Sequence, residues 1–176
     1  AKLESVEIKS SGVLVTSRLF GIVDGETAVE ATTAYFIRGQ KKPGGAKKAK
    51  APAPEPPAPD FETGFSIDED QSYRYADASL DDNPIHVDPE TAKSAGLPSV
   101  ILHGLCTMAM SGKSLVDTMA AGDPTRLKRL GVRFARPVFN GSKLTTHGWK
   151  TEDGAQFIVK DDQGNVVIAN GTVEIR

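Results

Sequence analysis

Alternating apolar and polar positions mark residues 1–40 as β-structure. In residues 13–20 and again in residues 29–37, apolar side chains recur at every second position, as on one face of a strand. Asp24 and Gly25 between the two runs form a typical hairpin turn. Because about forty residues of hairpin without a helix do not stand alone, we expect this segment to pack against other structure.

The pattern stops at residues 41–60, which read KKPGGAKKAKAPAPEPPAPD. This composition offers no apolar face to bury, so it predicts an extended, fairly stiff linker, with a docking site for a partner as the alternative. The chain is therefore expected to divide into strands at 1–40, a linker at 41–60 and a domain at 61–176.

The domain at 61–176 is expected to begin with a strand, FETGFSI, and two short helices, DQSYRYADAS and DPETAKSAG. The second helix carries Asp88 as its N-cap, Pro89 at its first position and Gly96 at its end. Residues 100–121 predict the longest helix, whose apolar positions recur at spacings of three and four. These positions are Ile101, Leu105, Met108, Gly112, Leu115 and Met119.

Four further runs predict a meander of strands after this helix, with turns such as Asn140-Gly141 and Asp153-Gly154 between them. The runs are RLKRLGVRFARPV, SKLTTHGWKT, AQFIVKD and NVVIANGTVEIR. A strand, one long buried helix and four strands predict an α+β fold in which an antiparallel sheet wraps the helix.

Composition narrows the function classes. The 176 residues are 39% hydrophobic and 25% charged, with a net charge of -2, which favours neither nucleic acid nor a membrane surface as partner. No apolar run is long enough to span a bilayer. The single cysteine, Cys106, excludes an internal disulfide, and the first residues lack a signal-peptide core, so we expect a cytoplasmic protein.

The candidate chemistry lies in the turn that joins the two short helices. Asp81 and His86 flank Asn83-Pro84, and Pro84 restricts both its own backbone and that of Asn83. Such a turn can direct a carboxylate and an imidazole into one pocket, which suits general acid–base catalysis near neutral pH. The structural alternative is a loop in which Asp81 caps a helix and His86 is partly buried.

Residues 75–110, YADASLDDNPIHVDPETAKSAGLPSVILHGLCTMAM, resemble the MaoC-like, (3R)-specific enoyl-CoA hydratases, also called hydratase 2. The family pattern is roughly Ser-Gly-Asp-x-Asn-Pro-(Leu/Ile)-His, then Asp-Pro and (Ile/Val)-(Leu/Val)-His-Gly. A weaker match continues through VRFARPVFNGSKL. Leu80 replaces the usual glycine before the aspartate, which predicts a narrower pocket or a shifted turn.

This resemblance implies a hot-dog fold, an antiparallel sheet wrapped around one long central helix. It also implies that residues 1–40 are the closing strands of a partial first hot-dog, because AYFIRGQKKPGG resembles the junction between two hot-dogs in one chain. We then expect a homodimer, or association with a chain that supplies the rest of the first hot-dog.

The implied reaction is hydration of trans-2-enoyl-CoA to (3R)-3-hydroxyacyl-CoA, or the reverse dehydration, without metal or other cofactor. The catalytic pair maps onto Asp81 and His86, Asn83 maps onto a residue that helps to hold the water, and the N–H of Gly104 maps onto the oxyanion donor. A hot-dog thioesterase and a non-catalytic acyl-CoA-binding subunit are the alternatives. Acyl-chain length, the choice between CoA and acyl carrier protein, and the direction are not predicted.

Other candidate residues are expected to be structural. His103 is interpreted as a residue that packs behind the site, with a direct catalytic role as the alternative. His147 is interpreted as a surface or rim residue and Cys106 as an inert buried thiol. Five basic residues along one strand are interpreted mainly as a solvated face, with contact to CoA phosphates as the alternative. These are Arg126, Lys128, Arg129, Arg133 and Arg136.

Overall fold

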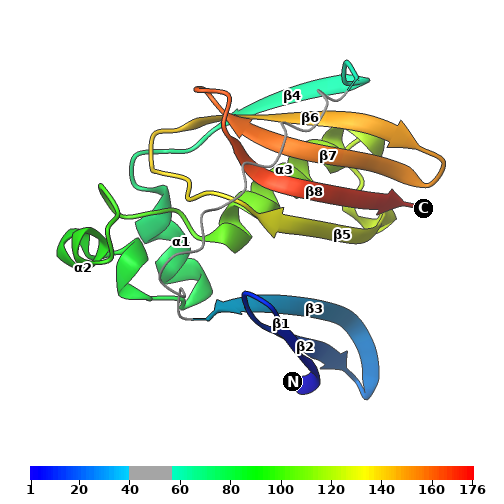
Figure 1. Cartoon of the computed structure of the whole chain (residues 1–176). Coiled ribbons are helices and arrows are strands. Elements are labelled where there is room, and N and C mark those ends of the chain that lie inside the picture. Colours follow the sequence, from blue (N-terminus) through cyan, green and yellow to red (C-terminus); the bar gives the residue numbers. More distant parts are fainter. Residues whose placement is uncertain (40–56) are drawn as a thin grey trace. The chain divides into compact units, whose positions relative to one another are not determined.

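The computed structural model describes residues 1–39 and 57–176, and the chain divides into two compact units, Ala1–Pro54 and Glu55–Arg176 (Figure 1). Most of the expected linker at 41–60 lies outside the described residues. Its last residues bind to a strand of the second unit: the Trp149 indole donates to the carbonyl of Pro57 at 2.9 Å, and the Lys150 amide donates to Asp60 at 2.7 Å.

The first unit is an antiparallel sheet in the order β1-β2-β3. Its strands are β1 (Lys2–Lys9), β2 (Gly12–Val23) and β3 (Glu26–Arg38). Asp24 and Gly25 both have positive φ, 51° and 82°, as a tight hairpin turn with the twist of its strands requires. The predicted hairpin is therefore present, and β1 adds a third strand within the residues expected to be β-structure.

One face of this sheet is apolar and exposed. The register aligns Val6, Val15 and Tyr35 across the three strands, and a neighbouring row aligns Ile8, Val13 and Ile37. Ile8 is 88% exposed, and Val6, Tyr35 and Ile37 are also exposed. We call these six residues the apolar face of the first unit.

The second unit holds an antiparallel five-stranded sheet in the order β4-β6-β7-β8-β5. Its strands are β4 (Phe61–Ser66), β5 (Leu127–Phe134), β6 (Lys143–Thr151), β7 (Gly154–Asp161) and β8 (Val166–Ile175). The predicted four-strand meander is wrong in one connection, since β5 pairs with β8 and lies at the opposite edge from β4. The segment 135–142 is longer than a hairpin turn and carries the chain across the sheet to β6.

The long helix α3 (Gly104–Met119) packs against β4, β5 and β8, as expected for a sheet wrapped around a helix (Figure 1). It begins four residues later than predicted, because residues 100–103 are extended and the Leu102 amide donates to the carbonyl of Val138 at 2.7 Å. The predicted helix face is also partly wrong: Leu115 and Gly112 are buried, but Leu105 is 60% exposed. Cys106 and Val116 take the buried positions instead.

Short helices connect the sheet to α3. They are α1 (Gln71–Ser79), the 3-10 turn η1 (Pro84–His86) and α2 (Pro89–Ser94), and η2 (Pro124–Arg126) follows α3. The predicted caps of α2 are confirmed, because the Asp88 side chain accepts from the Glu90 amide at 3.1 Å and Gly96 has a φ of 82°. In the part of the chain that is described, no helix is long and apolar enough to cross a membrane.

Candidate active site

The acidic turn is held by its own polar side chains. The Asn83 side-chain oxygen accepts from the Ile85 amide at 3.4 Å and caps η1, and the Asp81 carboxylate accepts from the Asn83 amide at 3.4 Å. Asn83, and not Asp81, is therefore the residue that caps the following turn. Pro84, whose φ angle is fixed by its ring, is the first residue of η1, and this turn ends at the buried His86.

Leu80 lies at the C-cap of α1 in the left-handed region, with φ 60° and ψ 22°. This is the position where the family pattern has glycine, and leucine adopts the glycine-like backbone at a cost of about 1 kcal/mol. Leu80 therefore forms the same kind of backbone turn that glycine would form at this position. The Leu80 side chain is 87% exposed and lines a separate cavity with Tyr73 and Val87, so it does not narrow the cavity next to His86.

The His86 ring is buried and has a defined tautomer. Its Nδ1 lies 2.7 Å from the carbonyl oxygen of Ile101, and a carbonyl only accepts, so Nδ1 carries the proton and Nε2 carries the lone pair. Burial lowers the pKa of His86 below 6.5 and outweighs the opposing effects of the Ile101 carbonyl and the Asp81 charge. Near neutral pH the ring is therefore a neutral base at Nε2.

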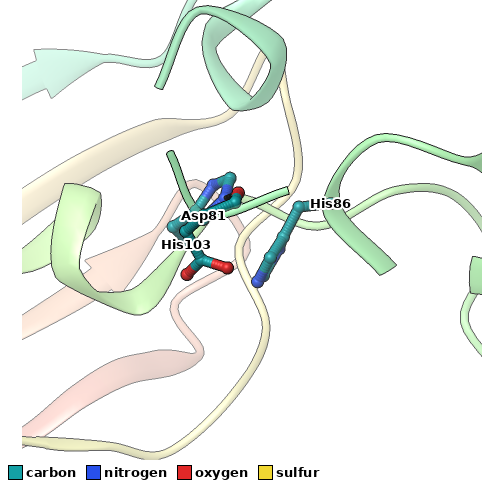
Figure 2. A group of neighbouring side chains, drawn as sticks. All are labelled: Asp81, His86 and His103. Atoms are coloured by element: carbon teal, nitrogen blue, oxygen red, sulfur yellow. Dashed lines mark hydrogen bonds between the residues drawn. The ribbon is translucent and has the colours of Figure 1, made fainter. Parts of the chain in front are cut away.

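Asp81, His86 and His103 form one cluster. One side-chain atom from each residue, a carboxylate oxygen or a ring nitrogen, lies within 4.8 Å of the corresponding atoms of the other two. Figure 2 shows the Asp81 carboxylate and a ring nitrogen of His86 on the same side of the loop. The ring of His103 stacks on that of His86, with centroids 3.8 Å apart and planes 25° apart.

This cluster is poorly suited to a metal ion, although it contains three residues of the ligating types. A metal binds in the plane of each imidazole at about 2.0 Å. Two stacked rings with planes only 25° apart do not direct their lone pairs to one nearby point. The arrangement fits proton transfer better than metal coordination.

A cavity of about 420 Å³ adjoins the cluster. His86 and Gly104 line it, together with a mainly apolar wall. Gly104 is the first residue of α3, so its N–H has no partner within the helix. A Cβ at Gly104 would lie 3.2 Å from the Phe134 ring, so glycine allows the ring to lie close to this helix end. The other lining residues are Leu97, Ile101, Leu102, Thr107, Ala135, Arg136, Pro137, Val138, Val167 and Ile168.

The structure brings the expected site residues Asp81, Asn83 and His86 together on one loop and places Gly104 on the adjoining cavity. Sequence reasoning missed the apolar wall and Phe134, whose only signal was the weaker family match in VRFARPVFNGSKL. It named Arg136 only as part of a basic strand, and Arg136 also lines the cavity.

Cys106 is buried as expected, and burial raises the pKa of its thiol. His147 lies in β6 outside the cluster, 2.8 Å from Glu62, and its side chain is half-buried, which fits a rim position and not a fully exposed one. His103 is buried, as a packing residue would be, but it contacts both members of the proposed catalytic pair.

An antiparallel sheet wrapped around one long helix, with Asp81, His86 and His103 clustered near the start of that helix, is the arrangement of a hot-dog domain. The family description "MaoC like domain" matches residues 51–172. The chain belongs to the MaoC-like dehydratase family.

Characterised relatives extend the match to residues 1–40. The chain is 36% identical to 3-hydroxyacyl-thioester dehydratase Y of Mycobacterium tuberculosis, over 96% of this chain and 61% of that protein. It is 33% identical to peroxisomal multifunctional enzyme type 2 of Mus musculus, over 95% of this chain and 23% of that protein. The chain therefore spans less than two thirds of these relatives.

Solved structures agree with the fold. A MaoC-like dehydratase from Phytophthora capsici superposes with a TM-score of 0.87 at 30% identity, over 99% of this chain and 60% of that chain. The full-length peroxisomal multifunctional enzyme type 2 from Drosophila melanogaster gives 0.86 at 31% identity, over 99% of this chain and 32% of that chain. The α+β hot-dog prediction is confirmed.

Proposed function

We propose that the chain catalyses the (3R)-specific hydration of trans-2-enoyl-CoA to (3R)-3-hydroxyacyl-CoA, or the reverse dehydration. The observation that carries this proposal is the pairing of a neutral His86, with Nε2 unprotonated, and the Asp81 carboxylate beside an apolar cavity that begins at a helix N-terminus. The names of the relatives, a 3-hydroxyacyl-thioester dehydratase and enoyl-CoA hydratases, support the same chemistry.

The tautomer of His86 suggests how one water molecule supplies both added groups. Nε2 takes a proton from the water as its oxygen bonds to the β-carbon, and the double-bond electrons move to the thioester oxygen. The same Nε2–H then protonates the α-carbon as the enolate collapses. The imidazole is restored, and both groups add to one face of the double bond.

Asp81 and Asn83 would hold that water. The carboxylate of Asp81 accepts a hydrogen bond from the second O–H of the water. Its negative charge also stabilises the imidazolium that forms on His86. The Asn83 oxygen already caps η1, so its amide nitrogen is the group that remains to donate to the water.

The thioester oxygen becomes negative during this reaction, and we assign its stabilisation to the N–H of Gly104. The Gly104 N–H is unpaired within α3 and lies at the positive end of the helix dipole. A donor that meets charge only as it develops lowers the barrier more than it tightens substrate binding. The reaction needs only water and a thioester, so no metal or redox cofactor is invoked.

We further propose that the apolar face of the first unit is covered in an assembly, either a homodimer or a complex with a chain that completes the first hot-dog. Two rows of apolar side chains on a three-stranded sheet, exposed on the outer strands and half-buried on β2, are unfavourable in water. A related structure is titled the ChsH1-ChsH2 complex from Mycobacterium tuberculosis. The proposed location remains cytoplasmic, supported by a single buried cysteine and no possible internal disulfide.

The test is an absorbance assay at the enoyl-thioester band with crotonyl-CoA and a longer enoyl-CoA, followed by chiral analysis of the product. Loss of the band with formation of the (3R)-hydroxy product supports the proposal. Release of free CoA thiol would instead indicate a thioesterase. Tight binding of the thioester without any change in the band would indicate a non-catalytic subunit.

A further inference from the structure

We infer that His103 is a positioning residue that holds both members of the proposed catalytic pair, which takes it beyond a packing role. This inference rests on the proposed function. His103 is 2% exposed and lies at the N-cap of α3, just before Gly104. It thus touches three parts of the site: the Asp81 backbone, the His86 ring and the start of the helix.

The first contact fixes the position of Asp81. Nε2 of His103 lies 2.8 Å from the carbonyl oxygen of Asp81. Since a carbonyl only accepts, Nε2 must carry a proton and donate it. Asp81 itself is exposed, and among residues 1–39 and 57–176 its side chain accepts only the long hydrogen bond from the Asn83 amide. The buried His103 donor therefore anchors the backbone from which the carboxylate extends.

The second contact holds the His86 ring. The two imidazoles stack at 3.8 Å, and the Ile101 carbonyl binds the edge of His86 at Nδ1. A ring held on its face and on one edge has little freedom to rotate, so Nε2 keeps its direction toward the Asp81 side. Tyr75 packs against the His103 ring, with centroids 4.8 Å apart, and limits the movement of the stack.

The tautomer of His103 follows from its contacts. Its Nδ1 is buried and has no hydrogen-bond partner among the described residues, whereas Nε2 lies next to the Asp81 carbonyl. A proton on Nδ1 in place of Nε2 would leave a buried N–H without an acceptor and would remove the donor to Asp81. The Nε2–H tautomer therefore fits both ring nitrogens.

Two substitutions separate the two contacts. His103→Phe keeps an aromatic ring for the stack but removes the donor to the Asp81 carbonyl, and His103→Gln keeps an N–H donor at similar reach but removes the ring. His147→Gln is the matched control, because His147 lies in β6 outside the cluster. All variants are made in the full chain, and turnover is expressed per folded molecule from thermal melts.

We expect His103→Phe to lose on the order of 100-fold in kcat with KM nearly unchanged, the scale of a small misplacement of catalytic groups. His103→Gln should recover part of that loss, and His147→Gln should retain wild-type turnover. If folded His103→Phe and His103→Gln both turn over like the unsubstituted chain, the positioning role is wrong. If kcat falls only in proportion to the folded fraction, His103 is a packing residue and the inference is also wrong.

A measurement without turnover covers the case in which His103→Phe does not fold. In the unsubstituted protein, long-range 1H–15N NMR of the imidazoles should show a proton on Nε2 of His103 and the Nδ1–H form of His86. A His103 with its only ring proton on Nδ1 overturns the inference, because it could not donate to the Asp81 carbonyl. Absence of hydration by the unsubstituted chain refutes the proposed function, and the positioning role with it, whereas the His103 results above refute the positioning role alone.

Discussion

Substituting Gly104 by valine tests the proposed oxyanion donor at the start of α3. A Cβ at this position would lie 3.2 Å from three atoms of the Phe134 ring, and the methyl groups of valine would add atoms at a lining position of the cavity. Phe134 is 49% exposed, so its ring can shift, and we expect a loss of stability on the order of 1 kcal/mol. A domain of ordinary stability stays folded after such a loss.

The effect on turnover should be larger than the effect on stability. Blocking one oxyanion donor lowers kcat by about 100-fold, equivalent to about 2.7 kcal/mol of barrier. We therefore expect Gly104→Val to lose about 100-fold in crotonyl-CoA hydration per folded molecule, and Gly104→Ala, which adds only the Cβ, to lose less. The assay combines initial rates at the enoyl-thioester band with a thermal melt of each variant.

Gly112→Ala provides the control for packing in the same helix. Its Cβ would lie 2.9 Å from a methyl group of Leu130 in the core, away from the cavity lining. It should change stability and leave turnover per folded molecule intact. If Gly104→Val behaves like Gly112→Ala, with a lower melting temperature but unchanged turnover, Gly104 serves only close packing and the oxyanion role is wrong.

Three further predictions concern pH, the strained turn and the first unit. Because burial lowers the pKa of His86 below 6.5, turnover should fall only as the pH drops through that lowered pKa; an acid limb centred at or above 6.5 would contradict this. Between the lowered pKa of folded His86 and pH 6.5, the unfolded chain binds a proton that the folded chain does not. The contribution of His86 to the free energy of unfolding, measured by urea melts, should therefore be greatest above pH 6.5 and decline below it. Leu80→Gly should raise the free energy of unfolding by about 1 kcal/mol, because glycine tolerates a φ of 60°, and an unchanged or lower melting temperature would argue against strain at this residue. Deleting residues 1–40 should cause aggregation or loss of dimerisation in sedimentation velocity, and a monomeric truncated chain of equal stability would show that the apolar face has no partner.

Local signals predicted the elements that depend on local chemistry. The hairpin at Asp24-Gly25 requires two positive φ angles, and the α2 helix begins at an Asp88 cap followed by proline. Both features could be predicted because the residues that create them are neighbours in the sequence. The same holds for the Asp81–His86 turn, whose geometry depends on Asn83 and Pro84.

Features that depend on contacts between residues far apart in the chain could not be predicted from the local sequence. The start of α3 depends on a hydrogen bond from Leu102 to Val138, which lies far along the chain, and so residues 100–103 looked helical. Strand order depends on where the chain goes after β5, and a meander was the simplest expectation. The contacts of His103 with Asp81 and His86 join three separate positions, so its sequence context indicated only a buried histidine.

The central claim is that Asp81 and His86 together add water to an enoyl thioester, and its most direct test is the kcat of crotonyl-CoA hydration by Asp81→Asn and His86→Ala. Asp81→Asn changes little in shape at an exposed side chain, whereas His86→Ala also removes the stacking on His103 and the hydrogen bond to the Ile101 carbonyl, so turnover is expressed per folded molecule. Each variant should lose at least about 100-fold in kcat. Circular dichroism confirms the fold of each variant. Hydration close to the wild-type rate by either folded variant would contradict the account.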